Sequence, residues 1–561
     1  MILQKRFYLA ATLLIIVSYF AIFLFYPLAF ALVKSVIVRG HFSLSFFYFL
    51  IQNPIMGEAI LNSLLIGVWV TLLSTIIGYL SAVFMTRFSF YGKTALGALL
   101  MAPMVLPPFV GAIGIKQVFG RFGMINSFLI QLGWMDAHNP IPWLSYPFWG
   151  VVILETLHLF PIMYLNIMAA FALIDPTLEE AGRGLGARGW SLFRTITLPL
   201  LLPGIFAGAA IVFIWAFTDL GTPLIFEFRN VVPVQIFVMV TQQTENPAGY
   251  ALVVVVLLAT LALFLPGRML FGRKRYSIIS YGRTVAEARK LSFASRVAIA
   301  VFFLVILSLA LIPHLSVILS SVSRTWFLTV LPEEWTLDYF GKVFNHQLAF
   351  LSIKNSVFLS AMSTGVDLIL GGTIAFLLAR SRLPGRDVLD AVTMLPLAIP
   401  GVILAFGYVG CFSGTALDPR INPFPLLIIS YSIRRLPLVV RALYAGLTQI
   451  DTTLEEAAAG LGAAPGTVMR TVTLPLILAN IIGASILAFA FAVLEVSDSL
   501  ILAMQEKFYP VTKAIYMLLG RLTDGQAVAS AMGVLGMILL IAALITAQRL
   551  LGRKMGQMFQ T

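Results

Sequence analysis

The chain has 561 residues, of which 60% are hydrophobic and only 11% are charged. A soluble protein carries about 25% charged residues, so a water-facing globular fold is excluded for most of this chain. The single cysteine, Cys411, excludes a disulfide framework and a thiolate metal cluster. The five histidines include no pair at ligand spacing, and we therefore predict no metal site.

Apolar segments recur along the whole sequence. A helix needs about 20 apolar residues to cross the hydrocarbon core, and about twelve segments reach that length. They lie near 8–33, 59–86, 95–117, 148–172, 200–224, 248–271, 295–321, 352–379, 388–412, 425–448, 476–503 and 527–550. The first follows Lys5 and Arg6 like a signal peptide, but its length and the lack of a cleavage site predict a retained membrane anchor.

The net charge of +13 is concentrated between the two hydrophobic halves. Because basic residues gather on the cytoplasmic side of membrane proteins, this distribution indicates orientation in a membrane and no nucleic-acid partner. Both termini are then predicted to be cytoplasmic. We divide the chain into a first module over 1–272, a cytoplasmic basic linker over 273–294 and a second module over 295–561. The block around the linker holds Arg268, Arg273, Lys274, Arg275, Arg283, Arg289, Lys290 and Arg296.

The two modules are copies of one another. Residues 173–199 (LIDPTLEEAGRGLGARGWSLFRTITLP) match residues 449–475 (QIDTTLEEAAAGLGAAPGTVMRTVTLP) at an offset of 276. Two six-helix copies in the same orientation predict an all-α integral membrane protein with parallel modules around a pseudo-twofold axis. Earlier in each half an offset of 293 relates Asn62 to Asn355. The same offset relates a pair of prolines that we expect to break or bend each third span, namely Pro103 and Pro107 with Pro396 and Pro400.

Each repeated segment predicts a short helix. Thr177 with Glu180, and Thr453 with Glu456, have the Thr-x-x-Glu spacing of a capping box. Small residues follow, and a glycine can then take the left-handed conformation that ends a helix. Such a helix could lie along the lipid headgroups or receive a partner protein. Two copies at one topological position favour the docking element.

The segment resembles the signature loop of ABC importer permeases that work with a solute-binding protein. In that loop a Glu-Ala-Ala triplet is followed by a glycine and then by Ile-x-Leu-Pro. The sequence departs from it at Gly182, where the family usually has alanine, and at Val472, where it usually has isoleucine. The fused layout resembles the ferric-iron-type permeases and implies a type I importer fold. The resemblance implies an ATPase-coupling role for Glu179, Glu180, Ala181, Gly182, Gly186, Glu455, Glu456, Ala457, Ala458 and Gly462.

The resemblance also implies partners. These are two copies of a cytoplasmic ABC ATPase, which bind ATP and Mg²⁺, and an extracytoplasmic solute-binding protein. The chain itself is expected to be no enzyme and to hold no cofactor. Its Gly92-Lys93-Thr94 string lacks the P-loop glycine five residues earlier, where Arg87 stands. We expect a multi-pass protein of the bacterial or archaeal inner membrane, in contact with lipid.

Ionisable residues inside spans are costly and mark candidates for the translocation pathway. Each also has an alternative role as a packing or ion-pairing residue. Asp219 corresponds to Glu495 across the repeat, which would place the two facing each other across the axis. In the fourth spans the copies differ, since Glu155 and His158 correspond to Tyr431 and Arg434. Asn62 and Asn355 complete the candidates, although interhelical hydrogen bonding is the role we favour for them.

The function that fits these patterns is import of a small solute by alternating access. We expect ferric iron first, with thiamine, polyamine or phosphonate compounds as runners-up. The alternative is a secondary transporter driven by an ion gradient, which leaves the duplicated helix unexplained. An intramembrane enzyme would need a nucleophile–base or metal constellation that this sequence does not supply.

Overall fold

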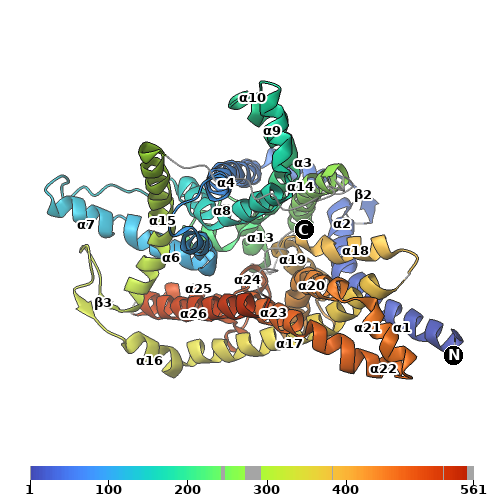
Figure 1. Ribbon diagram of the computed structural model, residues 1–561. Helices are drawn as coiled ribbons and strands as arrows, with labels where there is room; N and C mark the ends of the chain where they lie inside the picture. The colour runs from blue at the N-terminus through green and yellow to red at the C-terminus, as the bar shows by residue number, and fades with distance from the viewer. Residues whose placement is uncertain are drawn as a thin grey trace. The chain divides into compact units, whose positions relative to one another are not determined.

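The computed structural model describes residues 2–38, 40–241, 247–271, 292–381, 383–521 and 524–551. Most of these residues are helical (Figure 1), which confirms the all-α class. Strands occur in this part of the chain only as two short antiparallel hairpins. One pairs β1 (Ile37–Val38) with β2 (His41–Phe42), and the other pairs β3 (Ser323–Thr325) with β4 (Glu334–Trp335). The predicted linker, 273–294, lies outside the described residues up to residue 291.

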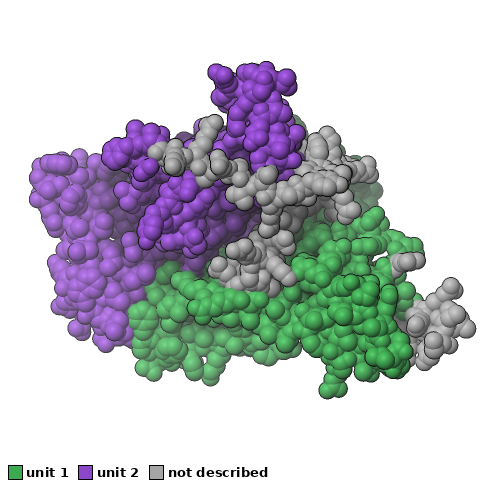
Figure 2. Space-filling view, in the orientation of Figure 1, with its two compact units in different colours: residues 1–57, 232–258, 340–558 green, residues 58–231, 259–339, 559–561 purple. Residues whose placement is uncertain are grey.

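The chain forms two compact units, coloured separately in Figure 2. Unit 2 comprises residues 58–231, 259–339 and 559–561. Its helices are α4 (Pro54–Arg87), α5 (Lys93–Leu99), η2 (Ala102–Val105), α6 (Pro108–Phe119), α7 (Met124–Gln131), α8 (Pro147–Leu173), α9 (Pro176–Gly184), α10 (Trp190–Leu192), η3 (Phe193–Thr197), α11 (Leu198–Thr218), α12 (Gly221–Ile225) and α15 (Phe293–Ser321).

Unit 1 comprises residues 1–57, 232–258 and 340–558. Its helices are α1 (Ile2–Phe20), η1 (Ala21–Phe25), α2 (Tyr26–Val36), α3 (Ser45–Gln52), α13 (Val232–Thr241), the first half of α14 (Pro247–Phe271), most of α16 (Asp338–Asn345), α17 (Gln347–Arg380), α18 (Arg386–Met394), η4 (Leu395–Ala398), α19 (Gly401–Cys411), α20 (Phe424–Gln449), α21 (Thr452–Gly460), α22 (Pro465–Val468), η5 (Met469–Thr473), α23 (Leu474–Val493), α24 (Ser497–Leu502), η6 (Glu506–Phe508), α25 (Val511–Leu519) and α26 (Gly525–Leu551).

The helices account for up to ten of the twelve predicted membrane spans. Within the described residues, eight helices are long and apolar enough to cross a membrane, and two bent helix pairs raise the number to ten. The other two predicted spans correspond to α14 and α20. α20 has the length of a span, but Arg434, Arg435 and Arg441 lower its apolar character. Spans also expose large apolar side chains, such as Leu14 and Ile369 (67% and 72% exposed), which suits a lipid environment.

The third span of each copy is broken, as the paired prolines predicted. The helical stretch Lys93–Val105 meets Pro108–Gln131 at 91°, and Arg386–Ala398 meets Gly401–Cys411 at 97°. Pro107 and Pro400 are the residues immediately before the second helix of each pair. Proline cannot continue the hydrogen bonding of the preceding turn, so the chain changes direction there.

The first span of each sequence half packs in the unit that contains the core of the other half. In unit 1, α2 packs on α19, and the Tyr408 hydroxyl donates to the backbone oxygen of Phe23 (2.7 Å). In unit 2, α15 packs on α6, and the Ser316 hydroxyl donates to the backbone oxygen of Gly114 (2.9 Å). The compact units therefore divide the chain differently from the module boundaries at 272 and 295, which follow the repeat along the sequence.

We call these two first spans, which contain α2 and α15, the exchanged spans. They pack against their units in the same way. A Cβ atom on Gly114 would lie 2.5 Å from the backbone oxygen of Pro313, and one on Gly407 would lie 3.0 Å from Cβ of Pro27. The two glycines are related by the offset of 293 that also relates Asn62 to Asn355. In each unit, a glycine of the broken third span thus allows the exchanged first span to approach closely at its proline.

Candidate functional site

Each repeated segment folds into a short helix, a glycine turn and a π-helical turn that leads into the next span. α9 and α21 have nine residues each. Gly186 and Gly462 follow with φ of 91° and 86°, a left-handed conformation that favours glycine. The predicted helix stop at these glycines is confirmed.

The helices begin differently from the prediction. Asp175 and Asp451 are the N-cap residues, and their carboxylates accept from the backbone nitrogens of Thr177 (2.9 Å) and Thr453 (3.0 Å). The predicted capping boxes, with these threonines as caps, are therefore wrong. A carboxylate is charged and accepts strongly at the positive end of a helix, so the aspartate two residues earlier takes the cap position.

The adjacent glutamates of each helix differ in burial and in partners. Glu179 is 7% exposed and accepts from Arg87, in part at 2.9 Å, and from the Thr197 hydroxyl at 2.8 Å. Glu455 accepts in the same way from Arg380 (2.9 Å) and from the Thr473 hydroxyl (2.9 Å). Their neighbours in sequence, Glu180 and Glu456, are both exposed.

Electrostatics favours the charged form of the inward glutamate in the first copy. Burial by itself raises the pKa of Glu179, but hydrogen bonds from Arg87 and Thr197 and the charges of Arg87 and Arg183 outweigh it. The pKa therefore lies below its ordinary value. Arg183, one turn along the same helix, contributes an ion pair at 3.2 Å.

Both departures from the family pattern are explained by packing. A Cβ on Gly182 would collide with Cδ1 of Ile196 and would lie 3.0 Å from Cδ1 of Leu192. In the second copy the equivalent residues are Ala458 and Val472, so a larger residue on the helix accompanies a smaller one on the following turn. Each copy fills the same space with a different distribution of methyl groups.

Beside its outward glutamate, each short helix exposes a leucine and small residues. Leu185 and Leu461, at the helix ends, are each 91% exposed. Ala181 and Ala457 are exposed next to the outward glutamates. Large apolar side chains with this exposure, beside small residues that permit close approach, are typical of a protein-docking surface.

In unit 1 two candidate pathway residues, Arg434 and Glu495, form a charged cluster with Arg435 and Asp498. Arg434 contacts Glu495, and it lies 3.4 Å from Asp498; Arg435 also contacts Glu495. Tyr431 shares a 2.6 Å hydrogen bond with Ser499. The two acids are less than 8% exposed. Ion pairing, the alternative role noted for these residues, is therefore observed here, as it is between Arg441 and Asp390 (3.1 Å).

In unit 2 the positions equivalent to Tyr431 and Glu495 hold the acids Glu155 and Asp219. Asp219 accepts from the backbone nitrogens of Gly221 (3.3 Å) and Thr222 (2.8 Å), and the Thr222 hydroxyl donates to Glu155 (2.7 Å). Glu155 is 1% exposed. Among the described residues neither carboxylate has an ion pair with lysine or arginine. Because Asp219 and Glu495 belong to different units, their placement across an axis stays a prediction.

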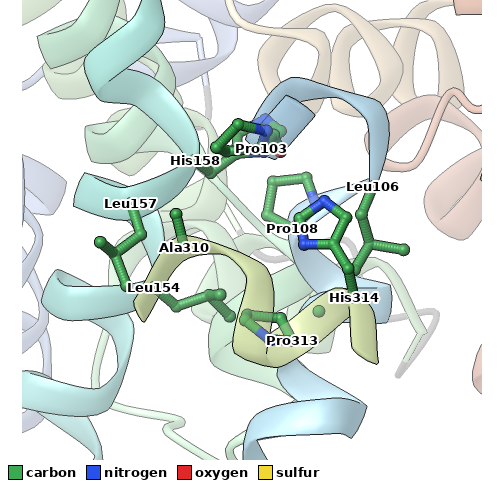
Figure 3. Close-up of a pocket in the computed structure, with 10 residues that line it drawn as sticks. Pro103, Leu106, Pro108, Leu154, Leu157, His158, Ala310, Pro313 and His314 are labelled. Atoms are coloured by element: carbon green, nitrogen blue, oxygen red, sulfur yellow. Dashed lines mark hydrogen bonds between the residues drawn. The ribbon is translucent and has the colours of Figure 1, made fainter. Parts of the chain in front are cut away.

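His158 lies where the third span of unit 2 is broken. Its Nδ1 is 3.0 Å from the backbone oxygen of Pro103. Figure 3 shows it beside a cavity of about 10 Å³ that is also lined by His314 and Pro313 of the exchanged span. That volume holds about one water molecule and no larger solute. A pathway role for His158 stays a prediction.

Asn62 and Asn355 have equivalent hydrogen bonds. Asn62 donates to the backbone oxygen of Asn230 (2.9 Å), and Asn355 donates to those of Lys507 (3.0 Å) and Tyr509 (3.1 Å). Each asparagine therefore ties the second span to the backbone just before α13 in unit 2 or α25 in unit 1. Hydrogen bonding is therefore observed, but its acceptors are backbone oxygens outside the long helices and not another span, as the favoured interhelical role would require.

Sequence reasoning missed the residues that hold the inward glutamates. Arg87 and Arg380 are related by the offset of 293, and Thr197 and Thr473 by the offset of 276. A search for polar residues preserved at both offsets would have found them. Sequence reasoning also missed a hydrogen-bonded link to the buried Asp367. The Tyr19 hydroxyl donates to the Ser432 hydroxyl (3.0 Å), which donates to the Asp367 carboxylate (2.7 Å).

The duplicated helical modules and their repeated segments define a multi-pass membrane transport subunit. Residues 74–276 and 369–557 match the family described as "Binding-protein-dependent transport system inner membrane component". The chain belongs to this family, and it is an inner-membrane permease of an ABC importer.

Relatives with different solutes match this chain. The ferric transport system permease protein FbpB of Actinobacillus pleuropneumoniae is 27% identical over 87% of this chain and 70% of its own length. The putative ferric transport system permease protein FbpB 1 of Haemophilus influenzae is 27% identical over 88% and 78%. The molybdenum transport system permease protein ModB of Escherichia coli (strain K12) is 31% identical over 37% and 90%. A bacterial alginate ABC transporter of known structure is 18% identical, with a TM-score of 0.34 over 46% of this chain and 99% of that chain.

Proposed function

We propose that this permease imports ferric iron, delivered by an extracytoplasmic solute-binding protein, and that α9 and α21 each dock on one copy of a cytoplasmic ABC ATPase. ATP binding closes the ATPase pair, draws the two docked helices together and switches the permease from inward-open to outward-open. Hydrolysis of ATP and binding of Mg²⁺ belong to the ATPase.

The duplicated short helix carries the docking proposal. Both copies have an aspartate cap, a left-handed glycine end, an exposed leucine (Leu185 or Leu461) and one outward glutamate (Glu180 or Glu456). A helix that only lay on lipid headgroups would need an apolar face. It would not need the same cap, helix end and outward glutamate in both copies. Two equal docking elements suit a partner that is present in two copies.

The substrate proposal is supported by the relatives that match most of the chain. The two FbpB proteins align over 87% and 88% of it, whereas ModB aligns with 37%, about one module. Thiamine, polyamine and phosphonate compounds remain the runners-up. The binding protein selects the solute in such an arrangement, so the permease needs only a pathway of suitable size and charge.

Reconstituted transport tests both parts of the proposal. The full chain is purified with the ATPase and binding protein that co-purify from its native membrane, and is placed in liposomes that contain ATP. Binding protein loaded with ⁵⁵Fe(III) is added outside. We expect ⁵⁵Fe uptake that requires ATP, the ATPase and the binding protein, and none when the nucleotide is omitted.

Two outcomes would contradict different parts. Uptake by the chain alone, driven by an imposed ion gradient, would identify a secondary transporter and remove the docking role. ATP-dependent uptake of labelled molybdate or thiamine, with none of ⁵⁵Fe, would overturn the substrate while leaving the importer intact.

A further inference from the structure

Each short helix is joined to two membrane spans through one inward carboxylate, which is buried for Glu179 and half-buried for Glu455. Glu179 of α9 binds Arg87, the last residue of α4, and Thr197, in the π-helical turn that begins the fifth span. Glu455 of α21 does the same with Arg380, the last residue of α17, and Thr473. We name these groups the anchor triads: Arg87–Glu179–Thr197 and Arg380–Glu455–Thr473.

The triads are shielded from water. Both threonines are 2% exposed. The side chains of Arg380 and Glu455 are 12% and 17% exposed, and those of Arg87 and Glu179 are 32% and 10% exposed. Exposed ion pairs contribute little because solvent screens them, whereas a buried carboxylate with charge-assisted hydrogen bonds holds a defined geometry.

Each anchor also has contacts outside its triad. In the first copy Arg183 lies 3.2 Å from Glu179. In the second, Arg380 also donates to the backbone oxygen of Ile450 (3.2 Å), at the end of the preceding span. The additional partners differ, but the arginine, glutamate and threonine are the same in both copies, so the connection itself is the shared feature.

A nine-residue helix needs such connections in order to transmit motion. Isolated helices shorter than about 12–15 residues are marginal in water, so α9 and α21 depend on tertiary contacts for their position. Most of the surface of α21 is exposed, and the structure describes no fully buried residue in it. Without its triad, the helix could shift on its loops while the spans stay in place.

We infer that the anchor triads are positioning residues that make each docking helix move as one body with the second and fifth spans of its own module, and so transmit ATPase closure to the pathway. This inference rests on the proposed docking function. Within each pair of glutamates the roles are divided: the outward glutamate faces the ATPase, and the inward one holds the helix to the spans.

The test separates assembly from coupling. The inward variant carries Glu179→Gln and Glu455→Gln, and its matched control carries Glu180→Gln and Glu456→Gln. Both are purified as complexes, and three quantities are measured: ATPase bound per permease, ATP hydrolysed, and ⁵⁵Fe imported per ATP. We expect the inward variant to bind the ATPase and hydrolyse ATP while its import per ATP falls at least about tenfold, because charge-assisted contacts are lost in both copies. We expect the outward variant to lose bound ATPase.

A cross-link distinguishes transmission from a general structural role. In a Cys411→Ser background, Arg380→Cys with Glu455→Cys removes the second triad, and a short bifunctional thiol reagent then joins the two positions. We expect import per ATP to be low before the reagent is added and to recover after it. Should the glutamine variants fail to fold, Arg87→Lys with Arg380→Lys keeps the charges, and we expect it to lower the same ratio.

The outcomes bear on different claims. An inward variant with wild-type import per ATP, or a cross-linked protein without recovery, would overturn the triads' role and leave the importer assignment standing. Loss of bound ATPase in the inward variant would also overturn it, because the triads would then shape the docking face. Failure of the unaltered permease to bind any ATPase would instead overturn the proposed function.

Discussion

The two repeated segments and the two intramembrane polar clusters have diverged to very different extents. In the segments, caps, helix ends, anchor residues and exposed leucines agree between the copies. In the clusters, Glu155 and His158 of one module correspond to Tyr431 and Arg434 of the other. One cluster pairs two arginines with two acids, while the other holds two acids without a basic ion-pair partner among the described residues.

This difference is what two kinds of partner would require. In the proposed function, a partner present in two identical copies would need two equal docking elements, which would keep the repeated segments alike. A single solute in the proposed pathway does not require the two modules to be alike, so its surroundings are free to differ between them. The first two predictions below test one side of this comparison each.

The largest effect is expected from removing both outward glutamates. We expect Glu180→Ala with Glu456→Ala to abolish uptake, since two hydrogen bonds to charged groups at about 1.5–3 kcal/mol each amount to a hundredfold or more in ATPase affinity. Uptake of ⁵⁵Fe is measured in vesicles, with permease quantity checked by immunoblot. Normal uptake by a correctly inserted double variant would count heavily against the docking role.

The second prediction contrasts the intramembrane acids. Glu495→Gln removes the carboxylate that Arg434 and Arg435 share. Breaking a buried ion pair in this way lowers the free energy of unfolding by about 3–5 kcal/mol. Asp219→Asn should cost about 0.5 kcal/mol or less, because asparagine also accepts at a helix start. Melting of the detergent-purified protein measures both. Equal losses would show that the two clusters are more alike than their contacts indicate.

The third prediction concerns the packing of residue 182 against residue 196, where the two copies distribute methyl groups differently. Gly182→Ala overpacks the first segment against Ile196 and should cost about 1–3 kcal/mol. Adding Ile196→Val recreates the Ala458–Val472 combination of the second segment, so we expect it to restore most of the loss. Uptake and melting temperature of the single and double variants are compared. A double variant no better than Gly182→Ala would mean that the copies are not interchangeable here.

The smallest effect is a pH dependence. The pKa of Glu179 is lowered from 4.5, so its contribution to stability is complete above that value and is lost as pH falls through the lower pKa of the folded protein. We expect the difference in melting temperature between the unaltered protein and Glu179→Gln to be constant between about pH 6 and 8 and to shrink in acid. A difference that changed near neutral pH would assign the titration to another group.

The sequence predicts features that depend on local pattern. The broken third spans follow from Pro107 and Pro400, and the helix ends from Gly186 and Gly462, since each residue acts on its own turn. The caps were wrong because an aspartate two residues earlier competes better than threonine for the same donors. The anchor arginines were missed because Arg87 and Arg380 precede their glutamates by 92 and 75 residues. Only the fold brings such residues together.

The exchanged first spans have a consequence for biosynthesis. Phe23, in the first span, is bonded to Tyr408, which leaves the ribosome 385 residues later. Unit 2 in turn needs α15, which belongs to the second half of the chain. Neither unit can therefore be completed from the first half alone, and a nascent chain that stops after it presents unpartnered spans to the insertion and proteolysis machinery. Because the two modules are fused in one chain, both exchanged spans are made in equal amounts.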